Sequence, residues 1–533
     1  MLTRLHTRRF PDTGICTPEQ ARELALIAFS CKRHLGLLID RKGGVDMVIV
    51  GDQQSVCIPE LERAREGRGR LSGLRFLHIL PTDGLLTQED IMDMIFLRLD
   101  AVIALGTAGG APTRTQSASL LPGKEKGWQI TDPVRWDVCQ IDFSAQAQAI
   151  EDELARTGQI LETENSQGCA LLVSVSTQSH RAQLLEMEEL AELARTAGLI
   201  PAGQFIQRVS SPNPNHILGK GKLAELEISA LQHGAGLLLF NQELTPAQQR
   251  NLSRITERQI LDRTQLILDI FAQRALTKAG KIQVEIAQLK YMLPRLVGQN
   301  RALSRLAGGI GGRGPGETRL EMDRRKTRNR LGQLQRELQT VRRHRETTRR
   351  RRKQAGLPVI ALVGYTNAGK STLLNTLTDS HILAEDKLFA TLDPTSRRLR
   401  FPQDQEVILT DTVGFIRELP QDLKQAFLAT LEELGEASVL IQVADASHPQ
   451  LEEQIAAVNG LLRSLDLEHI PRVLALNKWD IVAPDLRDEL KQRFPEGSPV
   501  SARQKNSLHG LIEHVQKKLL TQHWSVEPSP VVQ

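Results

Sequence analysis

Residues 364–371 read Gly364-Tyr365-Thr366-Asn367-Ala368-Gly369-Lys370-Ser371. The stretch fits the pattern GxxxxGK(S/T), in which backbone N–H groups wrap the phosphates of a nucleotide. In that pattern the Lys370 ammonium neutralises the β- and γ-phosphate oxygens, and the Ser371 hydroxyl ligates Mg²⁺. The apolar run 359–363 predicts a buried strand before the loop, and residues 371–377, which include Thr372, predict a helix after it. The fold class is therefore α/β, with a mostly parallel sheet of the P-loop type.

Two further motifs narrow the ligand to a guanine nucleotide. Asp411-Thr412-Val413-Gly414 follows an apolar strand, where the carboxylate can hold Mg²⁺ through water and the glycine N–H can meet the γ-phosphate. In Asn477-Lys478-Trp479-Asp480 the final carboxylate can accept hydrogen bonds from N1–H and the 2-amino group of guanine. Adenine offers no such pair, so ATP would leave a buried carboxylate unpaired. The phosphate loop alone fits an ATPase or a chance match equally well, whereas the three motifs together predict a GTP hydrolase.

Other parts of the predicted nucleotide site are less specific. Val500-Ser501-Ala502 weakly resembles the loop that caps the base. Phe389-Ala390-Thr391-Leu392-Asp393 is the best candidate for the segment that senses the γ-phosphate, with Thr391 completing the Mg²⁺ shell. Thr395 is a rival, and a loop threonine without a ligand role is the other alternative. Asn367 is a candidate ligand for a monovalent cation such as K⁺, although stabilisation of the loop is the favoured role.

No catalytic residue is assigned. Phe415 follows Gly414 at the position where many GTPases carry a glutamine that orients the attacking water. A phenyl ring cannot orient water. We therefore expect slow unaided hydrolysis that depends on a partner, a bound cation or another residue.

A basic segment precedes the G domain. Apolar residues at heptad spacing between Leu331 and Val341 predict a long amphipathic helix, and Ile282 to Leu296 repeat with the same spacing, so the two helices are expected to form an antiparallel hairpin. Pro294 is expected to kink the first helix. A solvated charged face is the usual interpretation, but this density of arginine with few acids favours nucleic acid. The candidate RNA-binding residues of the helix are Arg324, Arg325, Arg328, Arg342 and Arg343.

The segment between the two predicted helices is rich in glycine. Residues 308–317 are too glycine-rich for a helix and too long for a tight turn, so we expect a loop at the tip of the hairpin. It is either a plain connector or a probe that carries Arg313 into a narrow space lined by RNA.

The chain resembles the HflX family of translation-associated GTPases. The resemblance rests on residues 311–325, 364–371, 389–393 and 217–222, and it covers roughly residues 168–521. It implies binding to the large (50S) ribosomal subunit and its rRNA, and GTP hydrolysis stimulated there. In several members it also implies the splitting of stalled or idle ribosomes, and a glycine-rich loop that points toward the peptidyl-transferase region.

Length and composition set the domain plan. The chain has 533 residues, which is too long for one hydrophobic core. Its formal net charge is +5. The five cysteines lack CxxC spacing, and no apolar run approaches the ~20 residues that span a bilayer, so a soluble, cytoplasmic protein without a membrane span is expected. A monomer is also expected, although no sequence pattern sets the oligomeric state. The predicted segments are an extension (1–165), a small α/β subdomain (166–262), the hairpin (263–353), the G domain (354–523) and a tail (524–533).

The sequence allows alternative roles for two segments of the N-terminal half. Lys220 and Lys222 on their glycine loop either touch RNA or simply turn the chain. In the extension, His78 and Asp90 resemble a degraded form of the zinc motif of JAMM peptidases. Leu80 replaces one of the two histidines that such a site needs, so an inactive scaffold is favoured over a peptidase.

Two functions of different class remain. In the first, a GTPase docks on the large subunit and splits or rescues ribosomes. In the second, an RNA-binding GTPase acts as an assembly or storage factor without splitting them. A zinc hydrolase with an attached GTP switch ranks last.

Overall fold

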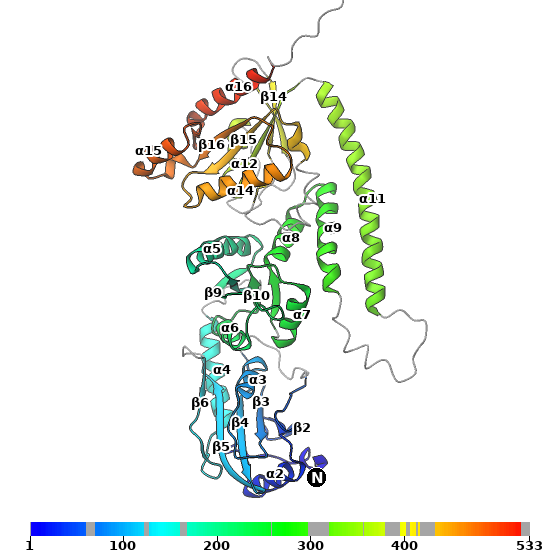
Figure 1. Cartoon of the computed structure of the whole chain (residues 1–533), viewed down its shortest axis with the longest axis vertical. Helices are drawn as coiled ribbons and strands as arrows, with labels where there is room; N and C mark the ends of the chain where they lie inside the picture. Colours follow the sequence, from blue (N-terminus) through cyan, green and yellow to red (C-terminus); the bar gives the residue numbers. More distant parts are fainter. Residues whose placement is uncertain are drawn as a thin grey trace, which may run out of the picture. The chain divides into compact units, whose positions relative to one another are not determined.

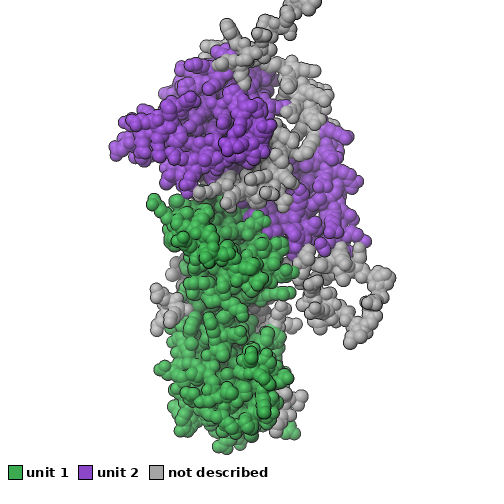
Figure 2. Space-filling view, viewed as in Figure 1, with its two compact units in different colours: residues 1–263 green, residues 264–533 purple. Residues whose placement is uncertain are grey.

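The computed structural model describes residues 2–59, 70–121, 127–159, 168–256, 258–296, 319–354, 357–378, 395–400, 406–411, 414–415 and 432–523. The chain forms two compact units, residues 1–263 and residues 264–533 (Figure 2). Helices and strands occur in both units (Figure 1), which confirms the predicted α/β class. Among the described residues, no helix combines the length and the apolar composition that crossing a membrane requires.

A seven-stranded sheet organises the first 159 residues, with strand order β2-β1-β3-β4-β5-β6 and β7 beside β5. Alternate side chains of a strand face opposite sides. Leu37 of β1 therefore packs in the core that includes α2, whereas Leu38 packs in the core that includes α3 and α4. The elements are α1 (Leu2–Leu5), α2 (Pro18–Cys31), β1 (Leu35–Asp40), β2 (Val45–Val50), β3 (Leu74–Ile79), α3 (Gln88–Phe96), β4 (Ala101–Ala108), β5 (Ala111–Leu120), β6 (Trp128–Ile130), β7 (Val134–Arg135) and α4 (Phe143–Gln159).

A second sheet of four parallel strands, in the order β11-β10-β8-β9, completes the first unit. Helix α6 contributes to both cores, because Leu226 packs with the second sheet and Ile228 packs with the first. Glu227, buried between them, accepts hydrogen bonds from Arg258 and Thr256 at 2.8 Å each. The buried side of α6 thus joins the extension to the second sheet. The elements are β8 (Cys169–Ser176), α5 (His180–Thr196), β9 (Ile200–Arg208), α6 (Lys220–Gln232), β10 (Leu237–Phe240), α7 (Pro246–Ile255) and β11 (Gln259–Asp262).

The predicted pair of helices begins the second unit. α9 and α11 lie side by side (Figure 1) and enclose a small apolar core of Ile282, Ile286 and Leu334. Arg330 adds a two-bond ion pair with Glu285, at 2.7 and 3.1 Å. Pro294 lies in the last turn of α9, one residue before its end, so little helix follows it. The glycine-rich loop 308–317 lies outside the described residues. The helices are α8 (Arg263–Arg274), α9 (Lys278–Arg295) and α11 (Arg319–Gln354).

A six-stranded sheet forms the G domain, in the order β13-β14-β12-β15-β16-β17. Only β13 is antiparallel, to its neighbour β14. α12 and α16 contribute to the core on one face, and α14 and α15 to the core on the other. This is a doubly covered parallel sheet of the predicted P-loop type. The elements are β12 (Val359–Gly364), α12 (Lys370–Thr378), β13 (Thr395–Arg400), β14 (Glu406–Asp411), η1 (Glu432–Glu436), β15 (Val439–Asp445), α14 (Leu451–Ser464), β16 (Arg472–Asn477), η2 (Trp479–Ile481), α15 (Pro484–Arg493), β17 (Ser498–Pro499), η3 (Lys505–Leu508) and α16 (His509–His523).

Candidate functional site

The G-domain sheet brings the three nucleotide motifs to one edge. The strands that carry them are parallel, so their carboxyl ends meet at the same side. β12 ends at Gly364 and β14 ends at Asp411, while Asn477 at the end of β16 pairs with Asp445 at the end of β15. Ligands of open parallel sheets bind at such an edge.

Main-chain carbonyl groups of the phosphate loop fix the position of the Lys370 ammonium. The Lys370 Nζ donates to the carbonyl oxygens of Gly364 and Tyr365, at 3.0 and 2.7 Å, which leaves one of its three hydrogens for a ligand. Burial lowers the pKa of Lys370 to about 8, and nearby Asp411 opposes that shift. A phosphate would restore the charge balance of this buried ammonium.

Two glycines of the loop are required by close packing. A side chain at Gly364 would run into the Val443 carbonyl oxygen, and one at Gly369 would run into the amide of Asn477. Asn367 adopts a φ of +60°, a left-handed conformation that asparagine tolerates better than most residues. The conformation supports the loop-stabilising role for Asn367.

Ser371 and Asp411, the predicted Mg²⁺-binding residues, lie within hydrogen-bond distance of each other. The Ser371 hydroxyl donates to Asp411 Oδ2 at 2.7 Å, and Asp411 is buried. Mg²⁺ in nucleotide sites takes one or two protein oxygens and completes its shell with phosphates and water, so these two side chains fit the ion. The described residues contain no group of three His, Cys, Asp or Glu side chains that could hold a metal by themselves. Thr391 and the rest of 389–393, together with Thr412 and Val413, lie outside the described residues.

Phe415 is held against the phosphate loop by its main chain. Its N–H donates to the Gly364 carbonyl at 3.1 Å, and its carbonyl accepts from the Thr366 N–H at 2.7 Å. The Phe415 side chain is buried, 2% exposed. Phe415 therefore shapes the site through its backbone, and its ring does not replace the missing glutamine.

The base-recognition motif is tied to the phosphate loop through Asn477. Its Nδ2 donates to the Ala368 carbonyl at 2.7 Å, and its Oδ1 accepts from the Ala502 N–H at 2.8 Å. Val500 accepts a 3.1 Å bond from the Trp479 N–H. The structure thus places 500–502 beside the motif at 477–480, which the sequence indicated only weakly.

Two acidic residues complete the base side of the site. Asp480 is exposed, so its carboxylate is open to an incoming base and would become buried only when the base binds. Asp445 contacts Lys478 Nζ at 2.7 Å and also accepts hydrogen bonds from Ser447. Sequence reasoning missed Asp445. The available signal was an acidic residue that ends the apolar run of 439–444.

Five of the candidate RNA-binding arginines, at positions 324, 325, 328, 342 and 343, lie on α11. Arg325, Arg328 and Arg343 are exposed, and Arg324 is half-buried. The side chain of Arg342 and all of Arg313 lie outside the described residues. Lys220 begins α6 and Lys222 pairs with Glu225 at 2.6 Å, so their loop does start a helix, and RNA contact stays a prediction.

His78 and Asp90 of the extension belong to a buried polar network. His78 Nδ1 lies 2.7 Å from Asp90 Oδ1, and its Nε2 lies 2.9 Å from Nδ1 of His34. Asp90 also accepts hydrogen bonds from Thr87. Burial lowers the pKa of His34, and His78 lowers it further. Both nitrogens of His78 are therefore engaged, which fits the inactive-scaffold hypothesis.

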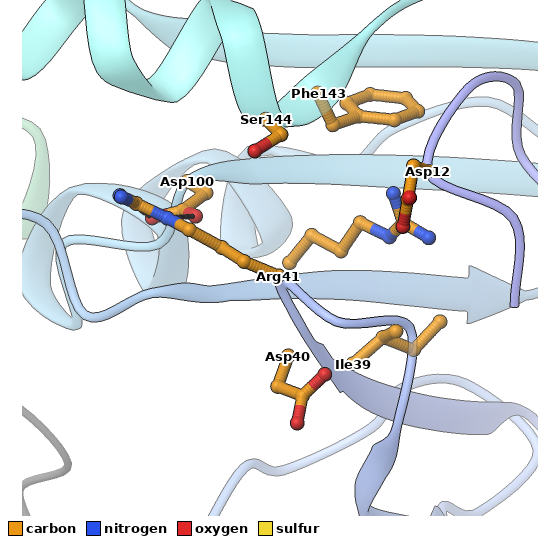
Figure 3. Close-up of a pocket in the computed structure, with 8 residues that line it drawn as sticks. Asp12, Ile39, Asp40, Arg41, Asp100, Phe143 and Ser144 are labelled. Atoms are coloured by element: carbon orange, nitrogen blue, oxygen red, sulfur yellow. Dashed lines mark hydrogen bonds and ion pairs between the residues drawn. The ribbon is translucent and has the colours of Figure 1, made fainter. Parts of the chain in front are cut away.

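A small pocket on the extension does not change that assignment. It is lined by Asp12, Asp40, Arg41, Asp100 and Ser144, among others (Figure 3), and encloses about 10 Å³. That is room for one water molecule. Arg41 forms an ion pair with Asp100 at 2.6 Å, so we assign the residues around this pocket a structural role.

Comparisons with known proteins agree with this geometry. Three family models match the chain: GTP-binding GTPase N-terminal at residues 185–272, GTP-binding GTPase Middle Region at 274–352 and 50S ribosome-binding GTPase at 359–478. The GTPase HflX of Caldanaerobacter subterraneus subsp. tengcongensis is 48% identical over 354 residues, which cover 66% of this chain and 80% of that protein. The GTPase HflX of Escherichia coli K12 is 48% identical over 297 residues, 55% of this chain and 70% of that protein.

A crystal structure of SsGBP in complex with GDP is 25% identical and covers 67% of this chain and all of that one, with a TM-score of 0.40. The nucleotide motifs converge on one edge of a P-loop sheet, and the sequence relatives match over most of their length. This chain is a GTP hydrolase that belongs to the HflX family of GTPases.

Proposed function

We propose that the protein binds the large (50S) ribosomal subunit and its rRNA through α11, hydrolyses GTP in response, and splits or rescues stalled or idle ribosomes in the cytoplasm. The observation that carries the proposal is the charge of α11. This helix has fifteen Lys and Arg and four Asp and Glu, a net charge of +11. The whole chain is only +5, so the rest of it is net negative.

Packing against α9 holds the basic helix α11 in place. The buried Leu334 and the Arg330–Glu285 ion pair hold one side of α11 against α9. Arg325 and Arg328 are exposed, which suits contact with phosphates along a nucleic acid backbone. The description of the model matched at 359–478, a 50S ribosome-binding GTPase, supports the same partner.

The buried Phe415 supports dependence on an activator. Residue 415 is phenylalanine and not the glutamine that orients water in many GTPases, so the unaided rate is expected to be low. The proposal includes Mg²⁺, held by Ser371, by Thr391 in the triphosphate state and by Asp411 through water, and K⁺ beside Asn367. Mg²⁺ would neutralise charge that develops on the phosphates. The monomeric state is part of the proposal.

Replacing Arg325 and Arg328 together with glutamine is expected to weaken binding to isolated 50S subunits by about tenfold at fixed salt. Each phosphate contact releases counterions from the RNA when the protein binds. The double variant makes fewer such contacts and releases fewer counterions, so the slope of log affinity against log salt should become shallower by roughly 1 to 2. Sedimentation of the protein with subunits, in the presence of a non-hydrolysable GTP analogue, measures both quantities.

The matched control is Arg463→Gln, which removes an exposed arginine of α14 that pairs with Glu468. GDP affinity should be unchanged in both variants, because neither site touches the nucleotide motifs. Unaltered subunit binding and an unaltered salt slope in the double variant would remove α11 from the proposal.

A further inference from the structure

Thr366, the third residue of the phosphate loop, carries a hydroxyl that has no hydrogen-bond partner among the described residues. The residue is 6% exposed, and its Oγ1 is fully buried without a hydrogen bond to any described residue. Leaving a buried hydroxyl unsatisfied destabilises a protein, and most buried polar groups are therefore paired. Its main-chain N–H is satisfied by the Phe415 carbonyl at 2.7 Å, so the side chain alone is unexplained.

Unpartnered buried hydroxyls occur at two places in the described part of the chain. They belong to Thr366 and Ser501, and both residues lie in nucleotide motifs. A fold that needed these hydroxyls for packing alone could have used an apolar side chain there. The coincidence indicates that the missing partners come from the nucleotide and its water.

The Thr366 side chain lies near the end of the site where the γ-phosphate would bind. A Cβ built on Gly414 would lie 2.8 Å from Thr366 Cγ2 and 3.1 Å from Lys370 Nζ. The threonine side chain and the lysine ammonium thus meet at the same glycine. In GTPases that glycine N–H meets the γ-phosphate, so Thr366 stands at the γ-phosphate end of the site.

We propose that Thr366 is a catalytic residue that positions the attacking water. Its Oγ1 accepts a hydrogen bond from the water, and its own hydrogen is donated to a γ-phosphate oxygen. A hydroxyl can do both at once. The water oxygen forms a bond to the γ-phosphorus, the bond from that phosphorus to the β–γ bridging oxygen breaks, and GDP keeps the electron pair. The water protons leave with inorganic phosphate and solvent, and Thr366 is unchanged.

This role accounts for Phe415. The main-chain bonds between 364–366 and 415 hold the threonine in place, while the buried ring contributes no polar group. The function usually given to a side chain after the glycine thus moves to the phosphate loop. The single hydrogen of the Thr366 hydroxyl is donated to the γ-phosphate, so only its oxygen holds the water, whereas a glutamine amide has both an acceptor and donors to offer. Slow unaided hydrolysis therefore still follows.

The test compares Thr366→Val, which keeps the shape and removes the hydroxyl, with Thr366→Ser, which keeps the hydroxyl. Single-turnover GTP hydrolysis by the full chain is measured without ribosomes at fixed Mg²⁺ and K⁺. The valine variant is expected to lose at least about tenfold in rate, as loss of one positioned hydrogen bond in a transition state does. Its affinity for GDP should stay within about twofold, while its affinity for GDP with aluminium fluoride should fall as the rate does.

The serine variant should keep most of the wild-type rate, and the valine variant should melt at a higher temperature without nucleotide because an unsatisfied hydroxyl is gone. A wild-type rate in Thr366→Val would refute the proposal, and so would an equal loss in both variants. If Thr366→Val does not bind GDP, Thr366→Ala replaces it with the same expected results.

Discussion

Replacing Lys370 with alanine is expected to reduce GTP hydrolysis by at least about a hundredfold. The Lys370 ammonium is buried in the phosphate loop, where it donates hydrogen bonds to two carbonyl oxygens of the loop. Burial lowers the pKa of Lys370 to about 8, and an anionic phosphate beside the ammonium would favour its charged form. Alanine removes the only charge at this point of the loop. The rate of GTP hydrolysis measures the effect on catalysis, and the dissociation constant for GDP measures the effect on nucleotide binding.

The matched control for that variant is Lys491→Ala, an exposed lysine of α15. It should leave both quantities at the wild-type level. Circular dichroism checks that Lys370→Ala is folded. A folded Lys370→Ala protein with wild-type GDP affinity and hydrolysis would overturn the assigned phosphate site.

Replacing Asp480 with asparagine is expected to weaken GTP binding by at least about a hundredfold and to improve binding of xanthosine triphosphate. The carboxylate can accept from both N1–H and the 2-amino group of guanine. An asparagine amide would face the 2-amino group with a donor, whereas xanthine presents a carbonyl there. Titration calorimetry with both nucleotides gives the ratio of affinities directly.

Asp480→Glu tests whether position matters as well as charge, because it keeps the carboxylate and moves it outward by one methylene group. Affinity for GTP should fall without any gain for xanthosine triphosphate. An Asp480→Asn protein that still prefers guanine as strongly as the wild type would show that other residues read the base.

The nucleotide site was accessible from sequence because its motifs are short and contiguous. Phosphates demand glycines and a lysine at fixed spacing, and parallel strands then bring Asp411 and Asn477 to the same edge without further information. Asp445 was missed because it belongs to no motif and acquires its role through a contact with Lys478. The unsatisfied hydroxyl of Thr366 likewise appears only when its surroundings in space are known.

The N-terminal half shows a second reason for incomplete prediction. Sequence patterns separated the extension from the block that follows it, but helix α6 carries apolar residues on two faces, Leu226 for one core and Ile228 for the other. Periodicity alone does not say which sheet a face will cover. His34 was overlooked for a similar reason, because 44 positions separate it from its partner His78.

The central proposal is a GTPase activated by the large ribosomal subunit. Its most direct test is steady-state GTP hydrolysis by the purified full chain, with and without titrated 50S subunits, at fixed salt because arginine–phosphate binding depends on salt. We expect a slow rate for the protein alone and a strong, saturable increase as subunits are added. A rate that stays the same across the titration would contradict activation by the subunit, even though the protein would still be a GTPase.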